Sequence, residues 1–538
     1  MERDPTMSNT LQTDVAIIGS GVAGALVAHR LAGKGLKVTI LEAGPRIDRA
    51  EAFENFTKAP FKHDRSPYPP SLHAPQPGTS DGSSDYIIEK GSHPYDPHYI
   101  RGVGGTTWHW AGQTWRFLPS DFRVKTLYGV GRDWPLSYED IESYYGLAEK
   151  EMGVSGDLDL GSPRTQPYPM SPLQLTYWDK TLQNLLKPLG YDVVIQPAAR
   201  NSVAYDDRPP CCGSNNCIPL CPIGAQYSAD VHVKKAEKQG AQLIVNAVVD
   251  QLKVGPKGTI EEISYRNPNG QVFRVRAKAF VLAANGVETP KLLLLSRSEK
   301  TPRGVANSSD LVGRNLMDHP GYKVEFSMPE PVYVGRGPVE VGAVMNFRDG
   351  DFRKTYGSIK IGVWNSPPPL DQIMHTALRQ GLAGNLLRDK VRDTLARRCT
   401  LTSFHEQLPD PANRITLSTQ RDTLGIPRPE IHYSIGEYSL KSVAHVRGIF
   451  DKIMTHVKAE EVIYGIKITT NNHIMGTTIM GDNPQHAVVD AQCRAHDHRN
   501  LFIAGSSVFA SGSAVNCTLT IAALSLRLAD HILKEGLT

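Results

Sequence analysis

A glycine-rich turn near the N-terminus constrains the fold more than any other feature of the chain. Residues 14–18 (DVAII) form a β-branched, apolar run, and Gly19, Gly21 and Gly24 follow it in a G-x-G-x-x-G spacing. A helical pattern and a second apolar run over residues 37–41 come next. Strand, glycine turn, helix and strand in this order predict a βαβ unit that binds a dinucleotide.

The residue types at this turn suit a pyrophosphate. Glycines let the backbone approach the phosphates closely, and the following helix N-terminus offers amide groups and the positive end of its dipole. Glu42 ends the second apolar run, about twenty residues past the glycines, where an acid accepts hydrogen bonds from the adenosine ribose. An ordinary strand–helix turn without a ligand is the alternative interpretation.

The dinucleotide domain is expected to be assembled from distant segments. Residues 51–96 are rich in Pro, Ser, His and Gly and lack periodicity, which indicates a long excursion from the domain. Strand patterns return at 243–252, 273–284 and 501–504, and an apolar-periodic helix over 518–533 closes the chain.

A second domain is predicted over residues 322–465, where strand patterns alternate around one helical region at 370–398. Residues 129–166 are typical of a helix bounded by proline-rich loops, and 206–221 are rich in turn residues.

Composition and charge exclude several classes of protein. The chain has 538 residues, 40% hydrophobic, with a formal net charge of +4 and no long basic block, so neither a disordered chain nor a nucleic-acid binder is expected. No apolar run reaches the roughly eighteen residues that a membrane span requires. Residues 1–13 are polar and contain acidic side chains, unlike a secretory signal, so export would need a partner.

Four of the seven cysteines, Cys211, Cys212, Cys217 and Cys221, fall within eleven positions. The run ends in Cys-Pro, as iron–sulfur runs of the ferredoxin type do. Zinc sites usually contain paired Cys-x-x-Cys knuckles, which this run lacks. An iron–sulfur cluster, structural disulfides and zinc all remain open on spacing alone.

Several segments together resemble one family nearly from end to end. They are residues 19–24 (GSGVAG), 41–44 (LEAG), 101–110 (RGVGGTTWHW), 283–290 (AANGVETP), 471–473 (NNH) and Asn516. They resemble the glucose-methanol-choline (GMC) family of FAD oxidoreductases. The cysteine run and Thr107-Trp108-His109-Trp110 resemble the catalytic large subunit of bacterial membrane-associated FAD glucose, fructose and gluconate dehydrogenases. One family signature is imperfect, because residues 296–298 are Ser-Arg-Ser where the family has Ser-Gly.

The resemblance implies an α/β fold. It would comprise a Rossmann-like FAD-binding domain made of discontinuous segments and an α+β substrate domain with an antiparallel sheet. The FAD-binding domain would take residues 11–50, 86–125, 222–320 and 480–538. The substrate domain would take residues 51–85, 126–210 and 321–479, with an iron–sulfur loop at 211–221.

The resemblance also implies which residues contact FAD. Beyond the first glycine turn and Glu42, the expected contacts are Gly104, Gly105, Thr106, His109, Val249, Gly505 and Ser506.

Alcohol oxidation needs a group that removes the hydroxyl proton as hydride leaves the carbon, and a neutral imidazole suits that task near neutral pH. By resemblance, His473 is this base. Asn516 takes the family's second position, where an amide holds the substrate oxygen, and Asn472 is a further substrate contact.

The resemblance resolves the cysteine run in favour of a [3Fe-4S] cluster with Cys211, Cys217 and Cys221 as ligands, Cys212 being spare. The expected function is therefore oxidation of a sugar, polyol or sugar acid, with electrons leaving through the cluster. The expected partners are a small signal-bearing subunit and a multihaem cytochrome c subunit, on the periplasmic side of the bacterial inner membrane. Two alternatives are an oxygen-using oxidase of the same family and a non-catalytic binding protein clamped by metal or disulfides.

Overall fold

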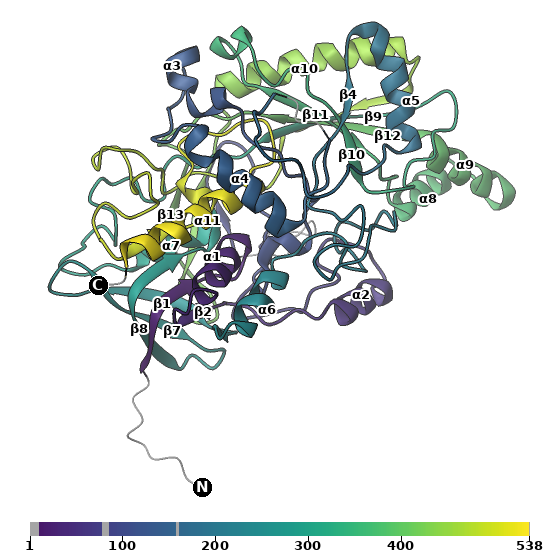
Figure 1. The fold of residues 1–538 in the computed structure, drawn as a ribbon. Helices are drawn as coiled ribbons and strands as arrows, with labels where there is room; N and C mark the ends of the chain where they lie inside the picture. The colour runs from purple at the N-terminus through teal and green to yellow at the C-terminus, as the bar shows by residue number, and fades with distance from the viewer. Residues whose placement is uncertain (1–9, 78–85, 158–160, 537–538) are drawn as a thin grey trace.

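The computed structural model describes residues 10–77, 86–157 and 161–536, and it contains three β-sheets (Figure 1). Part of the expected excursion, residues 78–85, lies outside the described residues. Within the described ranges no helix is both long and apolar enough to cross a bilayer.

The first sheet contains the glycine turn. Its strands lie in the order β5-β2-β1-β8-β7-β6, and β17 pairs with β8. Neighbours from β5 to β8 and β17 run parallel, whereas β6, β7 and β8 are antiparallel. Their bounds are β1 Thr10–Ile18, β2 Val38–Leu41, β5 Gln242–Ile244, β6 Val248–Val254, β7 Ile260–Arg266, β8 Val272–Leu282 and β17 Leu501–Ile503.

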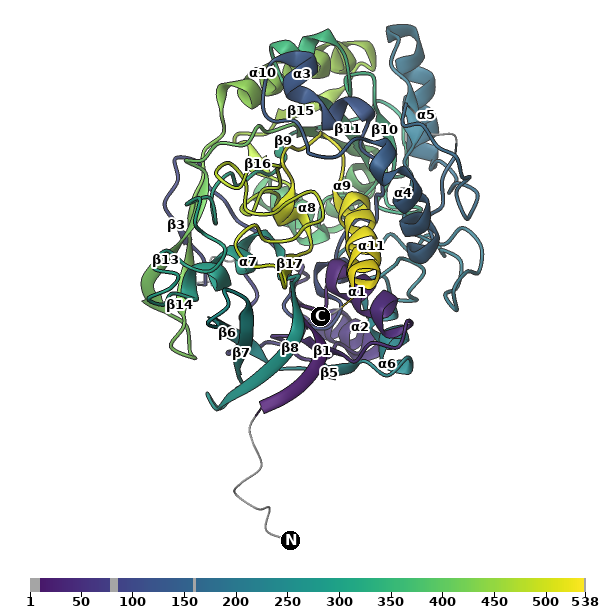
Figure 2. The ribbon, with the colours of Figure 1, turned by 60° about the vertical axis from the view of Figure 1, so that its left-hand side comes forward.

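Strand β1 lies between β2 and β8, and its burial agrees with this inner position in the sheet. Residues 15–18 are buried, and Ile17 lies between Ile40 of β2 and Val281 of β8. A strand covered on both faces is a continuous apolar run, as the sequence is here. Helices α1 (Val22–Ala32), α6 (Asp230–Lys238) and α11 (Thr518–Glu535) pack together on the sheet, so the first and last segments of the chain lie side by side (Figures 1 and 2).

The second sheet is antiparallel and has the order β15-β9-β12-β11-β10-β4, with β16 paired to β9. Helix α10 (Glu437–His456) packs on β9 and β12, and α5 (Tyr177–Leu186) packs on β4. Helices α8 (Leu370–Arg379) and α9 (Gly384–Arg397) pair beside it (Figure 1). The strands are β4 Val193–Ile195, β9 Pro320–Ser327, β10 Glu340–Val344, β11 Ile359–Trp364, β12 Arg398–His405, β15 Glu460–Tyr464 and β16 Thr469–Thr470.

The third sheet joins β13 (Arg414–Arg421), β14 (Pro427–His432) and β3 (Ile88–Glu89), and it packs against α7 (Asn285–Leu295), as Figure 2 shows. The remaining helices are α2 Arg49–Lys58, α3 Val124–Tyr128 and α4 Glu139–Met152. The α/β prediction is confirmed. The predicted domain boundaries stay a prediction.

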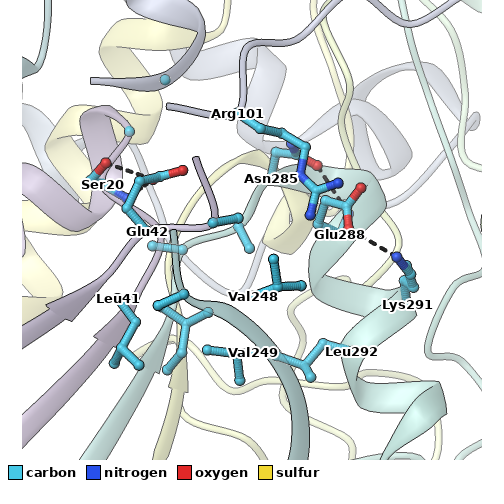
Figure 3. Close-up of a pocket in the computed structure, with 18 of the residues that line it drawn as sticks. Ser20, Leu41, Glu42, Arg101, Val248, Val249, Asn285, Glu288, Lys291 and Leu292 are labelled. Carbon is cyan, nitrogen blue, oxygen red and sulfur yellow. Dashed lines mark hydrogen bonds and ion pairs between the residues drawn. The ribbon is translucent and has the colours of Figure 1, made fainter. Parts of the chain in front are cut away.

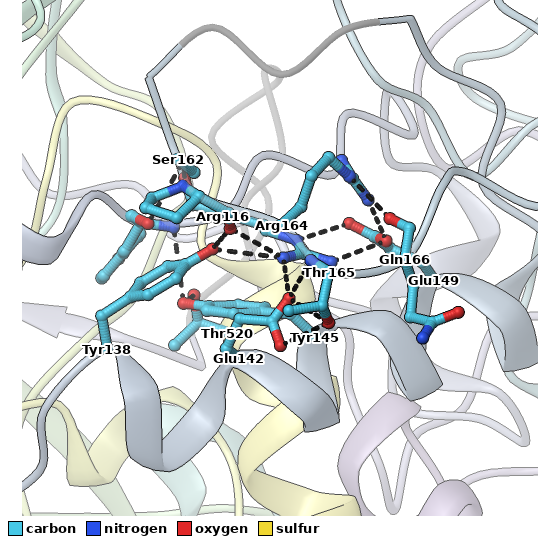
Figure 4. A network of polar contacts seen from close by, with 12 residues as sticks. Arg116, Tyr138, Glu142, Tyr145, Glu149, Ser162, Arg164, Thr165, Gln166 and Thr520 are labelled. Carbon is cyan, nitrogen blue, oxygen red and sulfur yellow. Dashed lines mark hydrogen bonds and ion pairs between the residues drawn. The ribbon is translucent and has the colours of Figure 1, made fainter.

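A buried ionic network joins α4 to Arg116, which lies in the loop that follows the 101–110 motif (Figure 4). The guanidinium of Arg116 donates to both oxygens of Glu149, over 2.8 and 3.0 Å, and to Glu142 over 3.0 Å. Arg164 also donates to Glu149. Because Arg116 and Glu149 are almost fully buried, removing one partner would leave an uncompensated charge, so the network holds this loop in one position.

Three elements differ from the sequence prediction in their lengths. The helix expected over 129–166 covers only 139–152, because Gly153 closes it in the left-handed region at φ 67°. The region 370–398 is two helices separated by a turn with Gly381 at φ 78°. The strand expected over 243–252 splits into β5 and β6 at Asn246, which has φ 54°.

Candidate functional site

Two adjoining cavities run from the glycine turn to His473. One, of about 820 Å³, is lined by the ends of β1 and β2, by β6 and by α7. The other, of about 1540 Å³, is lined by the 106–113 segment and by residues from the second sheet and the chain's end. Gly21, Thr106, Ala283 and Asn285 line both. One long ligand therefore fits across them, with one end buried at the first sheet.

The three glycines of the turn have different roles. Gly19 has φ 101°, and a Cβ there would collide with the carbonyl of Ala283. A Cβ on Gly24 would collide with the carbonyl of Gly19, so Gly24 permits helix and strand to pack but does not line the cavities. A Cβ on Gly21 would meet no protein atom within 4 Å. The turn thus leaves room at Gly21 for a group that approaches its backbone, as a pyrophosphate does.

Glu42 lies at the end of β2 with its carboxylate directed across the turn (Figure 3). Its Oε2 accepts from the backbone and hydroxyl of Ser20, over 3.0 and 2.6 Å, and its Oε1 accepts from the backbone of Gly44 over 3.1 Å. Burial raises the pKa of this carboxyl, and the hydrogen bonds oppose that rise. The carboxylate is held in place and keeps lone pairs for a ribose hydroxyl.

A buried charged cluster at the same cavity was missed by the sequence analysis (Figure 3). Glu288 accepts from the hydroxyls of Tyr86 and Tyr99, over 2.8 and 2.6 Å, and lies 3.5 Å from the ammonium of Lys291. These donors and Arg101 hold the pKa of Glu288 at about 2, despite its burial. Arg101 is 6% exposed, and its Nη1 has no hydrogen-bond partner in the described protein. An orphaned buried donor beside Glu42 fits an anionic or hydroxyl-rich ligand.

The far side of this cavity is apolar. Val248 and Val249 of β6 face Leu292 of α7 and Leu41 of β2 (Figure 3). A flat aromatic base fits such a slot, and Val249 lies where the sequence analysis expects an adenine contact.

The 101–110 motif forms a tight turn beside the glycine turn. Gly104 and Gly105 have φ 98° and 56°, and the backbone N–H of Gly104 donates to Ser20 Oγ over 3.3 Å. Thr106 lines both cavities, Gly105 lines the smaller one and His109 lines the larger one. Burial lowers the pKa of His109 to about 4. Gly104 lies behind the lining and allows the turn, with Trp108 Nε1 as its near neighbour.

Gly505 and Ser506 follow β17 and line the larger cavity. Gly505 has φ 120°, and a Cβ there would meet no protein atom within 4 Å, as at Gly21. The Ser506 hydroxyl donates to the carbonyl of Ile474, which fixes the loop to the segment that follows His473. Open backbone at Gly21 and Gly505 is thus a cradle for a bulky ligand, and a dinucleotide such as FAD fits it.

His473 lies in the larger cavity between two polar partners. Its Nε2 is 3.0 Å from the amide nitrogen of Asn516, and its Nδ1 is 2.8 Å from Nδ1 of His319. Its backbone N–H donates to Asp318 Oδ1 over 3.0 Å. Burial, with His319 and Lys360 as positive neighbours when charged, keeps the pKa of His473 well below its usual value. The imidazole is therefore neutral at neutral pH and can accept a proton.

Asn516 precedes α11 and is 8% exposed. Its carbonyl oxygen accepts from Lys360 Nζ over 2.9 Å, while its amide nitrogen faces His473. Asn472 lines the same cavity at φ 60°, and its Oδ1 accepts from the backbone of His98 over 2.8 Å. The structure therefore brings His473, Asn516 and Asn472 together, although 44 residues separate the first and last of them in sequence.

The cysteine run lies against the larger cavity, because Ile218 lines that cavity. Cys217 is buried, Cys211 and Cys221 are half-buried, and Cys212 is exposed. Burial raises the pKa of the Cys211 thiol, and the nearby Cys217 and Cys221 raise it further. The thiols of Cys217 and Cys221 are thus near enough to Cys211 to affect its ionisation.

The spacing of these thiols bears on which metal they suit. Among the described residues, only His29, Glu151 and His232 form a group of three or more possible ligands with all ligand atoms within 4.8 Å. A single tetrahedral zinc needs thiolates roughly 4 Å apart, since Zn–S bonds are about 2.3 Å. Among the described residues no three cysteine sulfurs fall within 4.8 Å of one another, so they are not gathered around a single zinc ion. All seven cysteines are free thiols, so those of the run keep the donor chemistry that an iron–sulfur cluster uses.

The His29, Glu151 and His232 group lies on α1, α4 and α6, away from both cavities. His232 Nε2 is 3.0 Å from Glu151, and its Nδ1 is 2.9 Å from the hydroxyl of Tyr227. His29 Nδ1 is 3.0 Å from Gln239. Hydrogen bonds within the protein thus account for this group as a contact between helices.

Arg101, Glu288, Lys291, His319 and Lys360 are the site residues that sequence reasoning missed. Arg101 and Glu288 stand inside the motifs that carry the family resemblance, so their position was a usable signal. Lys360 stands in an ordinary strand pattern and His319 directly precedes β9, and only the folded sheet brings them to His473.

Comparisons with known proteins agree with this geometry. Family models described as GMC oxidoreductase match residues 187–321 and 409–525, and one described as FAD dependent oxidoreductase matches residues 14–58. The chain is 46% identical to the fructose dehydrogenase large subunit of Gluconobacter japonicus, over 98% of this chain and 99% of that one. It is 28% identical to the 2-methyl-1,2-propanediol dehydrogenase of Mycolicibacterium austroafricanum, over 97% and 95%.

Among solved structures, the formate oxidase of Aspergillus oryzae RIB40 has the same fold, with a TM-score of 0.67 at 15% identity, covering 98% of each chain. The near end-to-end identity to a dehydrogenase large subunit confirms the resemblance stated from the sequence motifs. The chain belongs to the GMC oxidoreductase family and is a FAD-dependent oxidoreductase.

Proposed function

We propose that the chain is a dehydrogenase that oxidises a hydroxyl group of a sugar, polyol or sugar acid and delivers the electrons to a partner. The observation that carries this proposal is the pairing of His473 with Asn516, 3.0 Å apart, in a cavity that continues into the dinucleotide cradle. A base and an amide side by side suit a hydroxyl that must be both held and deprotonated.

In the proposed reaction, bound FAD supplies the hydride acceptor for the carbon that carries the hydroxyl. His473 Nε2 accepts the hydroxyl proton, which its lowered pKa and neutral state allow at neutral pH. Asn516 holds the substrate oxygen through its amide N–H groups, and Asn472 contacts a further hydroxyl. His473 and Asn472 are half-buried in the wall of the larger cavity, so the reacting groups are partly shielded from solvent.

FAD itself would be held by the residues of the cradle. Gly19, Gly21, Gly105 and Gly505 offer backbone, Glu42 accepts from the ribose, and Val249 contacts the adenine. Gly24 and Gly104 shape the turns behind it, while Thr106, His109 and Ser506 lie along the larger cavity. In this proposal Arg101 adds a donor, Nη1, that has no hydrogen-bond partner among the described residues.

The proposed substrate class rests on the similarity of the chain to known dehydrogenases and on the polar side chains among those that line the larger cavity. The relative from Gluconobacter japonicus is a fructose dehydrogenase, and two more distant relatives act on a propanediol and on paromamine by their names. All three substrates carry at least two hydroxyl groups, which amides such as those of Asn472 and Asn516 can recognise.

Electrons would leave through a [3Fe-4S] cluster held by Cys211, Cys217 and Cys221. The cluster supplies a one-electron path, which a reduced two-electron cofactor needs when the final acceptor is a cytochrome. The position of Ile218 in the cavity wall places the cysteine run next to the cofactor's proposed site, which supports this route.

The proposed partners are a small signal-bearing subunit and a multihaem cytochrome c subunit, on the periplasmic side of the bacterial inner membrane. The name of the Gluconobacter japonicus relative, a large subunit, supports partner subunits. This proposal keeps the domain boundaries predicted from the sequence and the iron–sulfur loop at 211–221.

A steady-state assay with a panel of ketoses, aldoses, polyols and aldonates tests the function. We expect one class to drive reduction of an artificial one-electron acceptor such as ferricyanide, with little oxygen uptake. Rapid peroxide formation without preference for the acceptor would favour the oxidase alternative. Failure of every compound, with no bound flavin, would favour the non-catalytic binding protein.

Cysteine variants test the electron route, with a matched control five positions away in the same run. Cys217→Ser is expected to leave flavin reduction by substrate intact and to slow delivery to cytochrome c by at least about tenfold. Cys212→Ser, an exposed cysteine of the same run, is the control and should behave as wild type. Equal rates in both variants would remove the cluster from the path.

A further inference from the structure

We propose that Lys360 is a positioning residue that fixes the direction of the hydrogen-bond chain ending at His473, and so selects the tautomer in which Nε2 can act as the base. This inference rests on the proposed function, because it concerns how the base is prepared for the hydroxyl proton.

Lys360 is fully buried on β11, in the sheet beside the cavity. Its ammonium faces three acceptors: Asn516 Oδ1 at 2.9 Å, Gln196 Oε1 at 3.1 Å and Glu340 Oε1 at 3.4 Å. It also lies 4.0 Å from the centre of the Phe404 ring. Because Lys360 does not line the cavity, it acts through Asn516 rather than on the substrate.

An ammonium group only donates hydrogen bonds. The carbonyl end of the Asn516 amide must therefore face Lys360, which leaves the NH2 end toward His473. Gln196 is oriented in the same way, because its Oε1 also accepts from the indole N–H of Trp115 over 3.1 Å, and an indole only donates. The usual ambiguity between the two ends of an amide is thus removed by the neighbours.

The orientation of Asn516 determines the protonation of both histidines. An NH2 group that points at His473 Nε2 requires an unprotonated nitrogen there, so the proton of the neutral ring lies on Nδ1. That N–H donates to Nδ1 of His319 over 2.8 Å, and His319 therefore carries its own proton on Nε2. Burial lowers the pKa of His319 to about 3, which keeps it a neutral acceptor.

Without Lys360, this order would be lost. The Asn516 amide could turn its oxygen to His473 Nε2, and the ring would then hold its proton on Nε2. Nε2 would then carry a proton, whereas in the present arrangement it carries a lone pair that can pass from the Asn516 N–H to the substrate hydroxyl. Lys360 therefore raises the fraction of molecules in which His473 Nε2 is unprotonated and can act as the base. This is a positioning effect.

A double-mutant cycle with Lys360→Met and Asn516→Ala tests this inference on the flavin-loaded enzyme. Lys360→Met alone should lower kcat/KM by about 10- to 100-fold, the range for losing a charged hydrogen bond. In the Asn516→Ala background the same change should matter less than about twofold, because the amide that Lys360 orients is gone. Lys354→Met, an exposed lysine of the same domain, should keep wild-type kinetics.

The outcomes separate this inference from the proposed function. Losses that multiply in the double variant would overturn the role of Lys360 and leave the base assignment intact. Wild-type kinetics in Asn516→Ala would overturn both. If Lys360→Met does not bind flavin, Lys360→Gln replaces it, since an amide of similar length can face Asn516 with either end, and an intermediate loss with the same cycle is expected.

The pH profile gives a readout that a structural role would not change. The titratable groups around His473 are Lys360 from β11, its partner Glu340 from β10, Asp318, which accepts from the His473 backbone, and His319 before β9. Lys360 and, when protonated, His319 lower the pKa of His473. Removing the ammonium should therefore raise the pKa of His473, so the acid limb of kcat/KM moves to higher pH in Lys360→Met. An unmoved limb would contradict direct electrostatic contact between the two groups.

Discussion

The two ends of the long cavity are built in different ways. At the dinucleotide end, the glycine turn and Glu42 come from one local stretch, residues 19–42, and the 100–106 segment, β6 and α7 complete the lining. At the substrate end, His319, Lys360, His473 and Asn516 come from four separate segments. A cofactor common to a family is held by a local motif, whereas the reacting groups depend on how two sheets are packed together.

This difference predicts which property of the protein a substitution at each end would affect. Gly21 and Gly505 leave open space because a ligand approaches them, whereas Gly24 is closed in by the protein itself. The substrate end instead consists of polar side chains that satisfy one another in a chain from Lys360 to His319. Substitutions should therefore affect binding at one end and the readiness of the base at the other.

The largest expected effect is at the substrate end. His473→Ala should lower turnover by roughly two to four orders of magnitude with flavin content intact, the usual scale for a positioned acid–base group. The control is His405→Gln, a buried histidine of β12 that hydrogen-bonds to Ser403 and Ser442. Turnover per bound flavin should stay near wild type there. A comparable loss in both variants would mean that His473 acts through packing alone.

A matched glycine pair sharpens the comparison at the dinucleotide end. Gly24→Ala should lower the Tm of the flavin-free protein, because its Cβ collides with Gly19, at a cost of about 1–3 kcal/mol or more. Gly21→Ala should leave that Tm unchanged and weaken FAD binding, since its Cβ enters space that only a ligand fills. Calorimetry without FAD and flavin titration give the two readouts. Identical behaviour of the pair would contradict the assignment of their roles.

Arg101 gives a smaller effect at the same end. Arg101→Met should weaken FAD binding by about tenfold, because its buried guanidinium has a donor without a protein partner. Turnover at saturating FAD should change little. The exposed Arg46, paired with Glu237, provides the control as Arg46→Met. Unchanged affinity in Arg101→Met would place the guanidinium in a purely structural role beside Glu288.

The pH dependence of the wild-type enzyme is the mildest test. The pKa of His473 lies well below its usual value through burial and its positive neighbours, so the neutral base is lost only as pH falls through that lowered pKa. We expect kcat/KM to stay flat as pH falls from 8 through the usual histidine range near 6.5, and to fall only in more acidic solution. A limb centred at or above 6.5 would show that the site does not depress this pKa.

The sequence predicted the dinucleotide end well because that end is local. Gly19, Gly21, Gly24 and Glu42 form a motif whose spacing follows from one strand, one turn and one helix. Fold class followed from this unit and from the resemblance. The structure places each glycine in a distinct role, a difference between Gly21 and Gly24 that spacing alone does not contain.

The substrate end was predicted in part. His473, Asn472 and Asn516 were named through motif resemblance, and the structure brings all three to one cavity. Lys360 and His319 were not named, because a lysine within a strand or a histidine just before one gives no signal until the pairing of β11, β12 and β9 brings it to the base. Long-range pairing of strands decides such contacts, and it leaves no local signal.

An anaerobic titration of the purified flavoprotein, expressed with its partner, tests the central claim most directly. Flavin absorbance and the electron paramagnetic resonance spectrum would be followed as a ketose or polyol is added. The account predicts that the flavin bleaches with one class of substrate and that the signal of an oxidised three-iron cluster disappears in step. A flavin that stays oxidised with every compound, or zinc in place of iron at the cysteine run, would contradict it.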